Sequence, residues 1–306
     1  MMDERLPAGM CVFERGWLSS NNMLFLGSDS TALVDSGYSS HAAQTVELVK
    51  HVLQTRPLDL LLNTHLHSDH CGGNALLQAT YPEMQTRIPP GQAALVSAWD
   101  TVALTYAPTG QLCQRFVFNQ LLRPGQHVVL ADLPWEVHAA PGHDPHSVIV
   151  FEPQSRTLIS ADALWESGFG VIFPELEGGH AFDEVAATLD LIEQLQPCTV
   201  VPGHGPVFSY RPAVMANARE RLAAFVKSPS RHAHHAAKVL LKFKLLEQQQ
   251  LLLADMIDWA KRTSYFGQIH QAFFASASFE AWLAELAQEL VHANVARQEG
   301  ELILNA

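Results

Sequence analysis

The chain reads THLHSDH at residues 64–70, which places three histidines and one aspartate within six consecutive positions. The apolar run Leu58–Leu62 precedes this segment and has the composition of a buried strand, and glycines at positions 72 and 73 follow it. Imidazole and carboxylate groups are common zinc ligands, with bonds of about 2.0–2.2 Å. On such a loop His65 and His67 can turn toward one ion. Asp69 and His70 can turn toward a second, so the segment predicts a metal site.

Three later segments repeat the order of an apolar strand, a tight turn and a ligand-type residue. These segments end at His143, Asp162 and His204, and a Pro-Gly pair stands directly before both histidines. Singly each signal is weak, because an aspartate after a strand is more often a helix cap than a ligand. If the strands share an orientation, their ends open on one edge of the sheet. The seven candidate ligands then divide into three imidazoles for one ion, Asp69, His70 and His204 for the other, and Asp162 between them.

Short segments rich in β-branched and aromatic residues alternate with turns over the first two thirds of the chain, which indicates strands. They are Met23–Leu26, Thr31–Val34, Leu58–Leu62, His127–Leu130, Trp135–Ala139, Ser147–Phe151, Thr157–Ser160 and Thr199–Val201. The spacing of apolar residues predicts covering helices at His41–Thr55 and Phe182–Leu195. After Pro212 four amphipathic helices are predicted. They are Ala213–Lys227, His232–Gln248, Leu251–Thr263 and Phe279–Ala296. We therefore expect a domain at residues 1–212 that carries the metal site and a helical C-terminal domain at 213–306.

The composition is that of a folded protein, with 48% hydrophobic and 16% charged residues. No apolar run approaches the roughly 20 residues needed to cross a bilayer. The first residues show no secretory signal, so we expect a cytoplasmic protein with no membrane partner. The four cysteines lie far apart and form no CxxC pair, which predicts reduced thiols rather than disulfides or a thiolate zinc site. Cys71, next to His70, is expected to pack in the interior and not to bind a metal.

The net charge of −12 is unevenly distributed along the chain. Residues 1–212 carry 9 Lys and Arg against 22 Asp and Glu, whereas residues 213–306 carry 10 against 9. The acidic first part would repel a polyanion. We therefore expect a small-molecule substrate and no nucleic-acid partner.

The order of the candidate ligands resembles the metallo-β-lactamase superfamily, whose HxHxDH motif is matched at residues 65–70. The resemblance covers about residues 10–210 and includes an early aspartate, Asp35, which in that family supports the metal loop without binding metal. It implies an α+β fold, an αββα sandwich with two divalent ions at one edge. We expect zinc, with iron or manganese as alternatives. The C-terminal helices resemble, more loosely, the winged-helix appendage of some relatives, with Val291–Gly300 as the last helix and turn. The implied metal ligands are His65, His67, Asp69, His70, His143, Asp162 and His204.

Departures from individual branches of the family narrow this resemblance. β-Lactamases of this fold lack an aspartate at the bridging position that Asp162 fills, and flavodiiron oxidoreductases have glutamate where His67 stands. The chain is therefore more similar to glyoxalase II, lactonases and related hydrolases. Lactonases often carry a tyrosine shortly after the bridging aspartate, and none occurs between Asp162 and Pro202.

The resemblance implies a hydrolase in which a metal-bridged hydroxide attacks the carbonyl of an ester, thioester or lactone. Asp69 is expected to be catalytic, because it would bind the second ion and steer the hydroxide proton. Two alternatives stay open. One is a mononuclear iron persulfide dioxygenase, which would use His65, His143 and Asp162, and the other is a regulatory or binding protein with little turnover.

The segment Trp165–Pro174 mixes large apolar groups with glycines and is a candidate pocket wall.

A second histidine cluster, His232, His234 and His235, begins a predicted C-terminal helix. No carboxylate accompanies it nearby, so we expect solvated side chains rather than another metal site. Three lysines at positions 238, 242 and 244 lie on the same helix. They are expected to form a solvated face, with neutralisation of an anionic substrate tail as the alternative.

Overall fold

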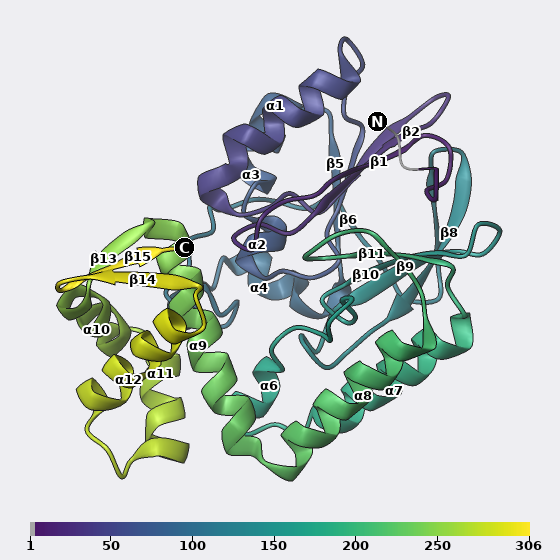
Figure 1. Cartoon of the computed structure of the whole chain (residues 1–306). Helices are drawn as coiled ribbons and strands as arrows, with labels where there is room; N and C mark the ends of the chain where they lie inside the picture. The colour runs from purple at the N-terminus through teal and green to yellow at the C-terminus, as the bar shows by residue number, and fades with distance from the viewer. Residues whose placement is uncertain (1–3) are drawn as a thin grey trace.

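The structure, a computed structural model, describes residues 4–306, and residues 1–3, the start of the expected first domain, lie outside this range. Two six-stranded mixed sheets face each other and helices cover their outer faces (Figure 1). A mainly helical region follows at the C-terminal end. The predicted αββα sandwich with a C-terminal helical region is therefore confirmed. Within residues 4–306 no helix is both long and apolar enough to cross a membrane.

The first sheet has the strand order β1-β2-β3-β4-β5-β6. Its strands are β1 (Met10–Phe13), β2 (Asn22–Leu26), β3 (Thr31–Val34), β4 (Leu60–Leu62), β5 (Gln85–Ile88) and β6 (Gln120–Leu121). The pairs β1–β2 and β2–β3 are antiparallel, whereas β3 to β6 pair in parallel. A parallel pair needs a crossover connection, and α1 (Ala42–Leu53) supplies it between β3 and β4.

The second sheet has the strand order β12-β11-β10-β9-β8-β7. Its strands are β7 (His127–Leu130), β8 (Leu133–Ala139), β9 (Val148–Glu152), β10 (Thr157–Ala161), β11 (Thr199–Pro202) and β12 (Phe208–Ser209). Neighbouring strands are antiparallel except β10 and β11, which are parallel and are joined through α7 (Phe182–Leu195). The strands β8, β10 and β11 therefore run in one direction, so their C-terminal ends lie at the same edge of the sheet.

The two-residue period of the strands divides the core into layers. Met23 and Phe25 of β2 face the second sheet, where the Phe25 ring meets the Trp135 ring with centroids 5.3 Å apart. Leu24 and Leu33 point to the opposite face and belong to the apolar cluster beneath α1. Because both faces of these strands are covered, apolar side chains occupy both faces rather than alternating with polar ones.

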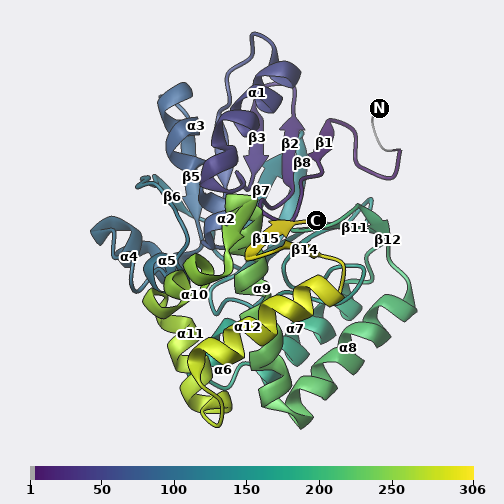
Figure 2. The same cartoon turned by 60° about the vertical axis from the view of Figure 1, so that its left-hand side comes forward.

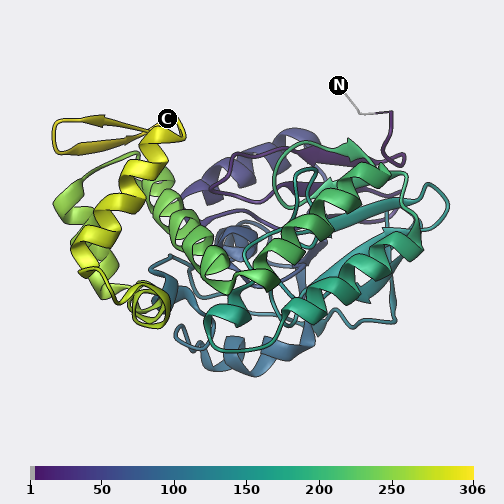
Figure 3. The ribbon, with the colours of Figure 1, turned by 60° about the horizontal axis from the view of Figure 1, so that its bottom comes forward.

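Helices cover both outer faces of the sandwich. α1 and α3 (Asn74–Thr80) cover the first sheet, and α7 and α8 (Pro212–Lys227) lie side by side over the second (Figure 3). α8 shares the apolar cluster of the second sheet through residues such as Met215, Ala218 and Phe225. Its packing therefore belongs to the sandwich although the helix follows residue 212. Shorter helical segments are η1 (Ser39–His41), α2 (Ser68–Cys71), η2 (Pro90–Gln92), α4 (Ala93–Ala98), α5 (Tyr106–Thr109) and α6 (Phe173–Leu176).

The region after Ser228 has a separate apolar cluster built on α9. Its elements are α9 (Pro229–Gln248), β13 (Gln250–Leu252), α10 (Leu253–Arg262), α11 (Ser264–Ile269), η3 (His270–Phe274), α12 (Phe279–His292), β14 (Ala296–Glu299) and β15 (Leu302–Asn305). In Figure 1 α9 stands between the sandwich and α10 to α12, which Figure 2 brings to the front. Tyr38 fixes this helix to the sandwich, since its hydroxyl donates to Glu247 Oε1 at 2.8 Å and its ring meets Phe243 edge-on at 5.1 Å.

The prediction of a helix and turn at Val291–Gly300 is wrong. α12 ends at His292, and Ala296–Glu299 forms β14 in a small antiparallel sheet with the order β13-β15-β14. Alanine, arginine, glutamine and glutamate all favour helices. Asn294 nevertheless turns the chain with a φ of 57°, and backbone pairing with β15 outweighs the local propensity.

Candidate metal centre

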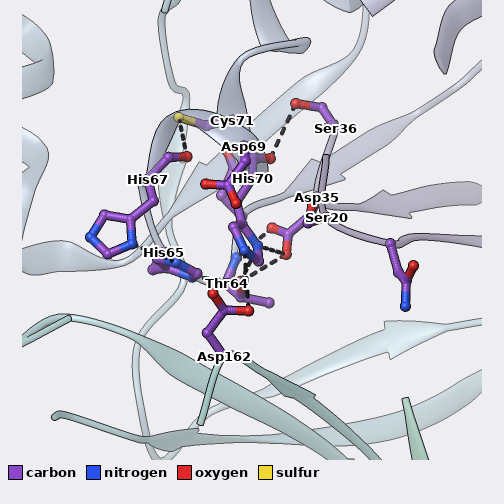
Figure 4. Close-up of polar contacts among 12 residues, drawn as sticks. Ser20, Asp35, Ser36, Thr64, His65, His67, Asp69, His70, Cys71 and Asp162 are labelled. Carbon is purple, nitrogen blue, oxygen red and sulfur yellow. Dashed lines mark hydrogen bonds and ion pairs between the residues drawn. The ribbon is translucent and has the colours of Figure 1, made fainter. Parts of the chain in front are cut away.

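The strand directions gather the predicted ligands at one edge of the sandwich. His143, Asp162 and His204 follow the ends of β8, β10 and β11, which run in one direction in the second sheet. The remaining four predicted ligands follow β4 of the facing sheet. His65 and His67 lie on the loop that leads into α2, and Asp69 and His70 lie in α2 itself. Figure 4 shows Asp162 reaching from the second sheet toward His65 and His70.

The structure brings all seven sequence-predicted residues together. Three groups of side chains each have donor atoms within 4.8 Å of one another. The groups are His65, His67 and His143; His65, His70 and Asp162; and Asp69, His70 and His204. Adjacent groups share His65 or His70, so the donors form two neighbouring sets that meet at Asp162, which is the pattern of a dinuclear centre.

The first set consists of three imidazoles with closely spaced nitrogens. His65 Nε2 lies 3.1 Å from His67 Nδ1, which lies 2.8 Å from His143 Nε2. Donors bound to one tetrahedral zinc ion at about 2.0–2.1 Å stand about 3.3 Å apart. Burial, reinforced by the neighbouring His70, holds the pKa of His65 well below its usual value, and burial together with His143 lowers the pKa of His67 to about 4. Both rings are therefore neutral at pH 7, which is the form that binds a metal.

The second set combines carboxylates with histidines. His204 Nε2 lies 3.0 Å from Asp69 Oδ2, and His70 Nε2 lies 3.4 Å from Asp162 Oδ1. The other oxygen of Asp162, Oδ2, lies 3.4 Å from His143 Nε2 and 3.9 Å from His204 Nε2. The two oxygens of Asp162 thus face different histidines, so this carboxylate could serve as a ligand shared between the two donor sets.

In this second set, neighbouring charges oppose the effect of burial on the pKa values of the carboxylates and of His70. Burial would raise the pKa of the Asp162 carboxyl, but the neighbouring His70 and His204 hold that pKa well below its usual value. Asp69 is likewise kept ionised against its burial, because its hydrogen bond with His204 lowers its pKa. Burial acts to lower the pKa of His70, but Asp162 and Asp35 raise it well above the usual value. Without metal His70 is therefore protonated, and an ion bound there must displace that proton.

Asp35 orients the loop and one ligand from outside the donor sets, as the resemblance implies. Its Oδ2 accepts a hydrogen bond from His70 Nδ1 at 2.8 Å, and Thr64 donates to its two oxygens through N and Oγ1 at 2.8 and 2.7 Å (Figure 4). Because Nδ1 donates to Asp35, Nε2 is the nitrogen that would give up its proton to a metal ion. Among residues 4–306 that buried Nε2 has no hydrogen-bond partner. An orphaned imidazole nitrogen facing a carboxylate fits a metal ligand.

Glycines let the backbone approach these ligands closely. His143 Nδ1 donates to Val171 O at 2.5 Å, and a Cβ on the adjacent Gly170 would stand 2.4 Å from the same nitrogen. A Cβ on Gly203 would stand 2.1 Å from Asp162 Oδ1. Ala161, directly before Asp162, has a φ of 46°, a conformation that costs about 1 kcal/mol or more for alanine. The strained, crowded turn fixes where the Asp162 carboxylate points.

Two tryptophans lie near the ligands. Trp165 begins the segment predicted as a pocket wall, whereas Trp17 was not identified from the sequence. The Trp17 ring stacks on the His204 ring with centroids 5.5 Å apart and an angle of 8°. Trp165 meets His204 edge-on at 5.5 Å and donates through Nε1 to Asp162 Oδ1 at 3.3 Å. Trp17 is 54% exposed, so its ring forms part of the rim of the site. No local motif marks it, because the segment meets His204 only through the fold.

A cavity of about 260 Å³ opens beside the donors, and Trp165, Val171 and Phe173 line one wall of it. Part of the segment predicted as a pocket wall therefore does contact the cavity. The C-terminal helix α9 also lines this cavity, through Leu240 and Phe243. Its apolar lining beside a polar end is typical of a small-molecule site.

The prediction that the second histidine cluster is solvated is wrong for His232. This ring is 1% exposed, and its Nε2 accepts a hydrogen bond from Ile172 N at 3.1 Å. His235 is half-buried and lines the same cavity as the metal donors. His234 pairs with Glu289 at 2.9 Å. His232 therefore connects α9 to the segment after Asp162, and His234 and His235 have partners on α12 and α8. Cys71 packs as predicted, with Sγ 3.2 Å from the Tyr106 hydroxyl.

Comparison with known proteins agrees with this geometry. The model of the metallo-beta-lactamase superfamily matches residues 15–204. The hydroxyacylglutathione hydrolase of Nostoc sp. (strain PCC 7120 / SAG 25.82 / UTEX 2576) is 30% identical over 164 residues, which are 50% of this chain and 54% of that protein. The chain thus spans about half the length of the curated relatives it matches.

Solved structures share the fold. A metallo-beta-lactamase family protein from Thermus thermophilus superposes with a TM-score of 0.55 at 17% identity, covering 97% of this chain and 99% of that one. A protein solved in a di-iron-bound form has a TM-score of 0.51 at 23% identity, covering 68% of this chain and 96% of that one. The family match spans more than half of the chain and includes every residue of the candidate centre. The chain therefore belongs to the metallo-β-lactamase superfamily.

Proposed function

We propose that this protein is a metal-dependent hydrolase that cleaves an ester, thioester or lactone with a hydroxide held between two divalent ions. The observation that carries the proposal is the pair of neighbouring donor sets that meet at Asp162 beside an apolar cavity. Two ions bound there would lower the pKa of a shared water toward neutrality and polarise a carbonyl oxygen. The 30% identity to a hydroxyacylglutathione hydrolase supports acyl transfer to water and makes a thioester the preferred substrate class.

The proposed metal ligands are the seven residues of the two donor sets. His65, His67 and His143 would hold one ion through neutral imidazoles, and Asp69, His70 and His204 would hold the other. Asp162, between the two sets, would be the seventh ligand. Zinc suits a mixed set of imidazole and carboxylate ligands. Iron or manganese is an alternative, and the related structure solved with two irons supports iron in this fold.

We assign the catalytic role to Asp69. Its side chain is 14% exposed and lines the cavity in which a substrate carbonyl would lie. Its carboxyl stays ionised because its hydrogen bond with His204 lowers its pKa. An ionised carboxylate at this position can orient the proton of the attacking water and then accept it.

The electrostatics and the shape of the site support a small organic substrate. The cavity of about 260 Å³ lies near the lower end of the range of about 300–1,000 Å³ for small-molecule pockets. Residues 1–212 carry the acidic excess of the chain, which disfavours a nucleic-acid substrate. The proposed partner is therefore a small acyl compound.

The test is metal analysis combined with turnover. Purified protein loaded with zinc, iron or manganese is analysed for bound metal and assayed against a panel of thioesters, esters and lactones. Two ions per chain with hydrolysis support the proposal, and Asp162→Asn is expected to lose most of the second ion. Asp29→Asn, an exposed aspartate away from the donors, serves as the matched control. Two bound ions without hydrolysis of any panel member would refute the hydrolase, and one iron with oxygen uptake would instead indicate a dioxygenase.

A further inference from the structure

Arg221 lies in the wall between two hollows of the molecule. It projects from α8 and lines the cavity that contains the metal donors. It also lines a second hollow of about 660 Å³ that opens to solvent. His235 of α9 and Ser167 line both hollows as well. A substrate whose carbonyl lies at the metal centre can therefore extend toward this guanidinium.

The surroundings of Arg221 hold its guanidinium in place. Its central carbon lies 5.4 Å from the ring centroids of both Phe169 and Phe225, and Nη2 donates to His235 Nε2 at 2.8 Å. Burial, and to a smaller extent the positive charge of Arg221, lowers the pKa of His235 to about 3. His235 is therefore a neutral hydrogen-bond acceptor. Contacts with aromatic faces stabilise a cation without neutralising it.

No carboxylate among residues 4–306 forms an ion pair with Arg221, in contrast to other arginines on α8 and nearby. Arg219 pairs with Asp190 at 2.7 Å and with Glu193 at 2.8 Å, and Arg211 pairs with Glu166 at 2.6 Å. Burial lowers the pKa of the Arg221 guanidinium, and its buried Nε has no hydrogen-bond partner in the described part of the chain. A guanidinium stays charged under these conditions, so no carboxylate in the described part of the chain offsets the cost of its partial desolvation.

The second hollow adds to the positive field around Arg221. Arg231 and Lys238 line it, against a single carboxylate, Glu220. Lys238 is paired with Glu289 at 2.8 Å, so its charge is partly satisfied. Arg221 is thus the cation that faces both the metal-donor cavity and solvent while retaining unused donors.

We propose that Arg221 binds a carboxylate of the substrate while the carbonyl to be attacked lies at the metal centre. The inference rests on the proposed hydrolase and deepens it, since it names an acyl compound that carries a carboxylate as the substrate class. The planar guanidinium offers two parallel N–H groups to a carboxylate, and His235 and the two phenylalanines are positioning residues that hold it.

The test uses two matched pairs of thioesters that differ by one charge. The first pair is the acetyl thioesters of 3-mercaptopropionate and 3-mercaptopropionamide, with the charge on the thiol. The second pair is the succinyl and succinamoyl thioesters of 2-mercaptoethanol, with the charge on the acyl group. In the zinc-loaded wild-type protein we expect one charged member to have a kcat/KM about 10- to 100-fold above that of its neutral partner, chiefly through KM.

Arg221→Gln is expected to reduce this charge preference to about unity. Arg219→Gln is the matched control, because it removes the same charge from a position two residues away, on another face of α8, and should keep the preference. If Arg221→Gln does not fold, Arg221→Lys keeps the charge without the planar fork and should lose part of the preference. Hydrolysis of the neutral members without any charge preference, or a preference that survives in Arg221→Gln, would overturn the inference and leave the hydrolase standing.

A binding measurement separates the two proposals if no thioester is hydrolysed. The thioether analogues of the two charged probes are titrated calorimetrically into zinc-loaded wild-type protein and Arg221→Gln. Binding that is at least about 10-fold weaker in the variant supports the anion site although the hydrolase has failed. Equal dissociation constants overturn the anion site as well.

Discussion

Replacing Gly203 by alanine should weaken metal binding without removing any ligand. The new Cβ would stand 2.1 Å from Asp162 Oδ1 and 3.0 Å from His70 Cε1. Ordinary contacts begin near 3.4 Å, so the carboxylate oxygen must move by about 1.3 Å. The backbone before Asp162 is already strained at Ala161, which has a φ of 46° and little freedom to adjust. The displacement therefore falls on the carboxylate or on the His70 ring.

The size of the effect follows from this displacement. A misplacement of about 1 Å in a preorganised site costs on the order of 100-fold in activity. Disturbing the residues that orient a metal ligand typically costs about 10- to 100-fold in affinity, which corresponds to about 1.4–2.7 kcal/mol. We expect zinc affinity of the weaker site to fall within that range and hydrolysis to fall at least as far.

Competition with a chromophoric chelator measures the affinity directly, and circular dichroism shows whether the variant folds. Gly16→Ala is the control, since a Cβ there meets nothing within 4 Å. If Gly203→Ala binds two zinc ions with wild-type affinity, the position assigned to the Asp162 carboxylate between the two donor sets is wrong.

Three further perturbations probe other parts of the structure. Asp35→Asn removes the carboxylate that orients His70 at 2.8 Å and should weaken zinc binding about 10- to 100-fold in chelator competition, whereas unchanged affinity would deny Asp35 that role. Removing the metal with a chelator should lower the melting temperature, because zinc at 100 times its dissociation constant stabilises the folded state by about 2.7 kcal/mol; a melting temperature indifferent to zinc would contradict a site formed only in the folded chain. Burial, together with Arg221, lowers the pKa of His232 to about 4. The unfolded chain, with a histidine pKa of about 6.5, then binds more protons between pH 6.5 and 4, so stability falls as the pH drops through that window, by up to about 3 kcal/mol. Denaturant unfolding of the metal-free protein at several pH values should show a flatter profile for His232→Gln, and identical profiles would count against this assignment.

The fold and the candidate ligands were predictable because their signals are local in sequence. The runs that became β2, β3 and β9 are mostly apolar without alternation, since both faces of these strands are buried. Six of the seven candidate ligands lie in HxHxDH or after a Pro-Gly turn, and Asp162 directly follows an apolar strand. Such patterns need no knowledge of tertiary contacts.

The features that escaped prediction depend on contacts between distant segments. β5 reads Gln-Thr-Arg-Ile, and it forms a strand because β4 and β6 pair with it on both sides. Trp17 reaches His204, and Arg221 reaches the metal cavity, only after the sheets and α8 have packed. The start of α9 reads as a polar histidine segment, yet packing against the segment after Asp162 buries His232. Sequence periodicity describes one element at a time and does not reveal contacts between segments that are distant in the sequence.

The parts of the chain that surround the candidate metal centre come from two separate stretches. All candidate donors lie between residues 65 and 204, whereas Arg221, His235, Leu240 and Phe243 in α8 and α9 also line the cavity. Mutations in those two helices can therefore alter which compound is accepted without disturbing the ion-binding apparatus. Substitutions in α8 and α9 could therefore change the substrate during evolution while the candidate metal ligands stay the same.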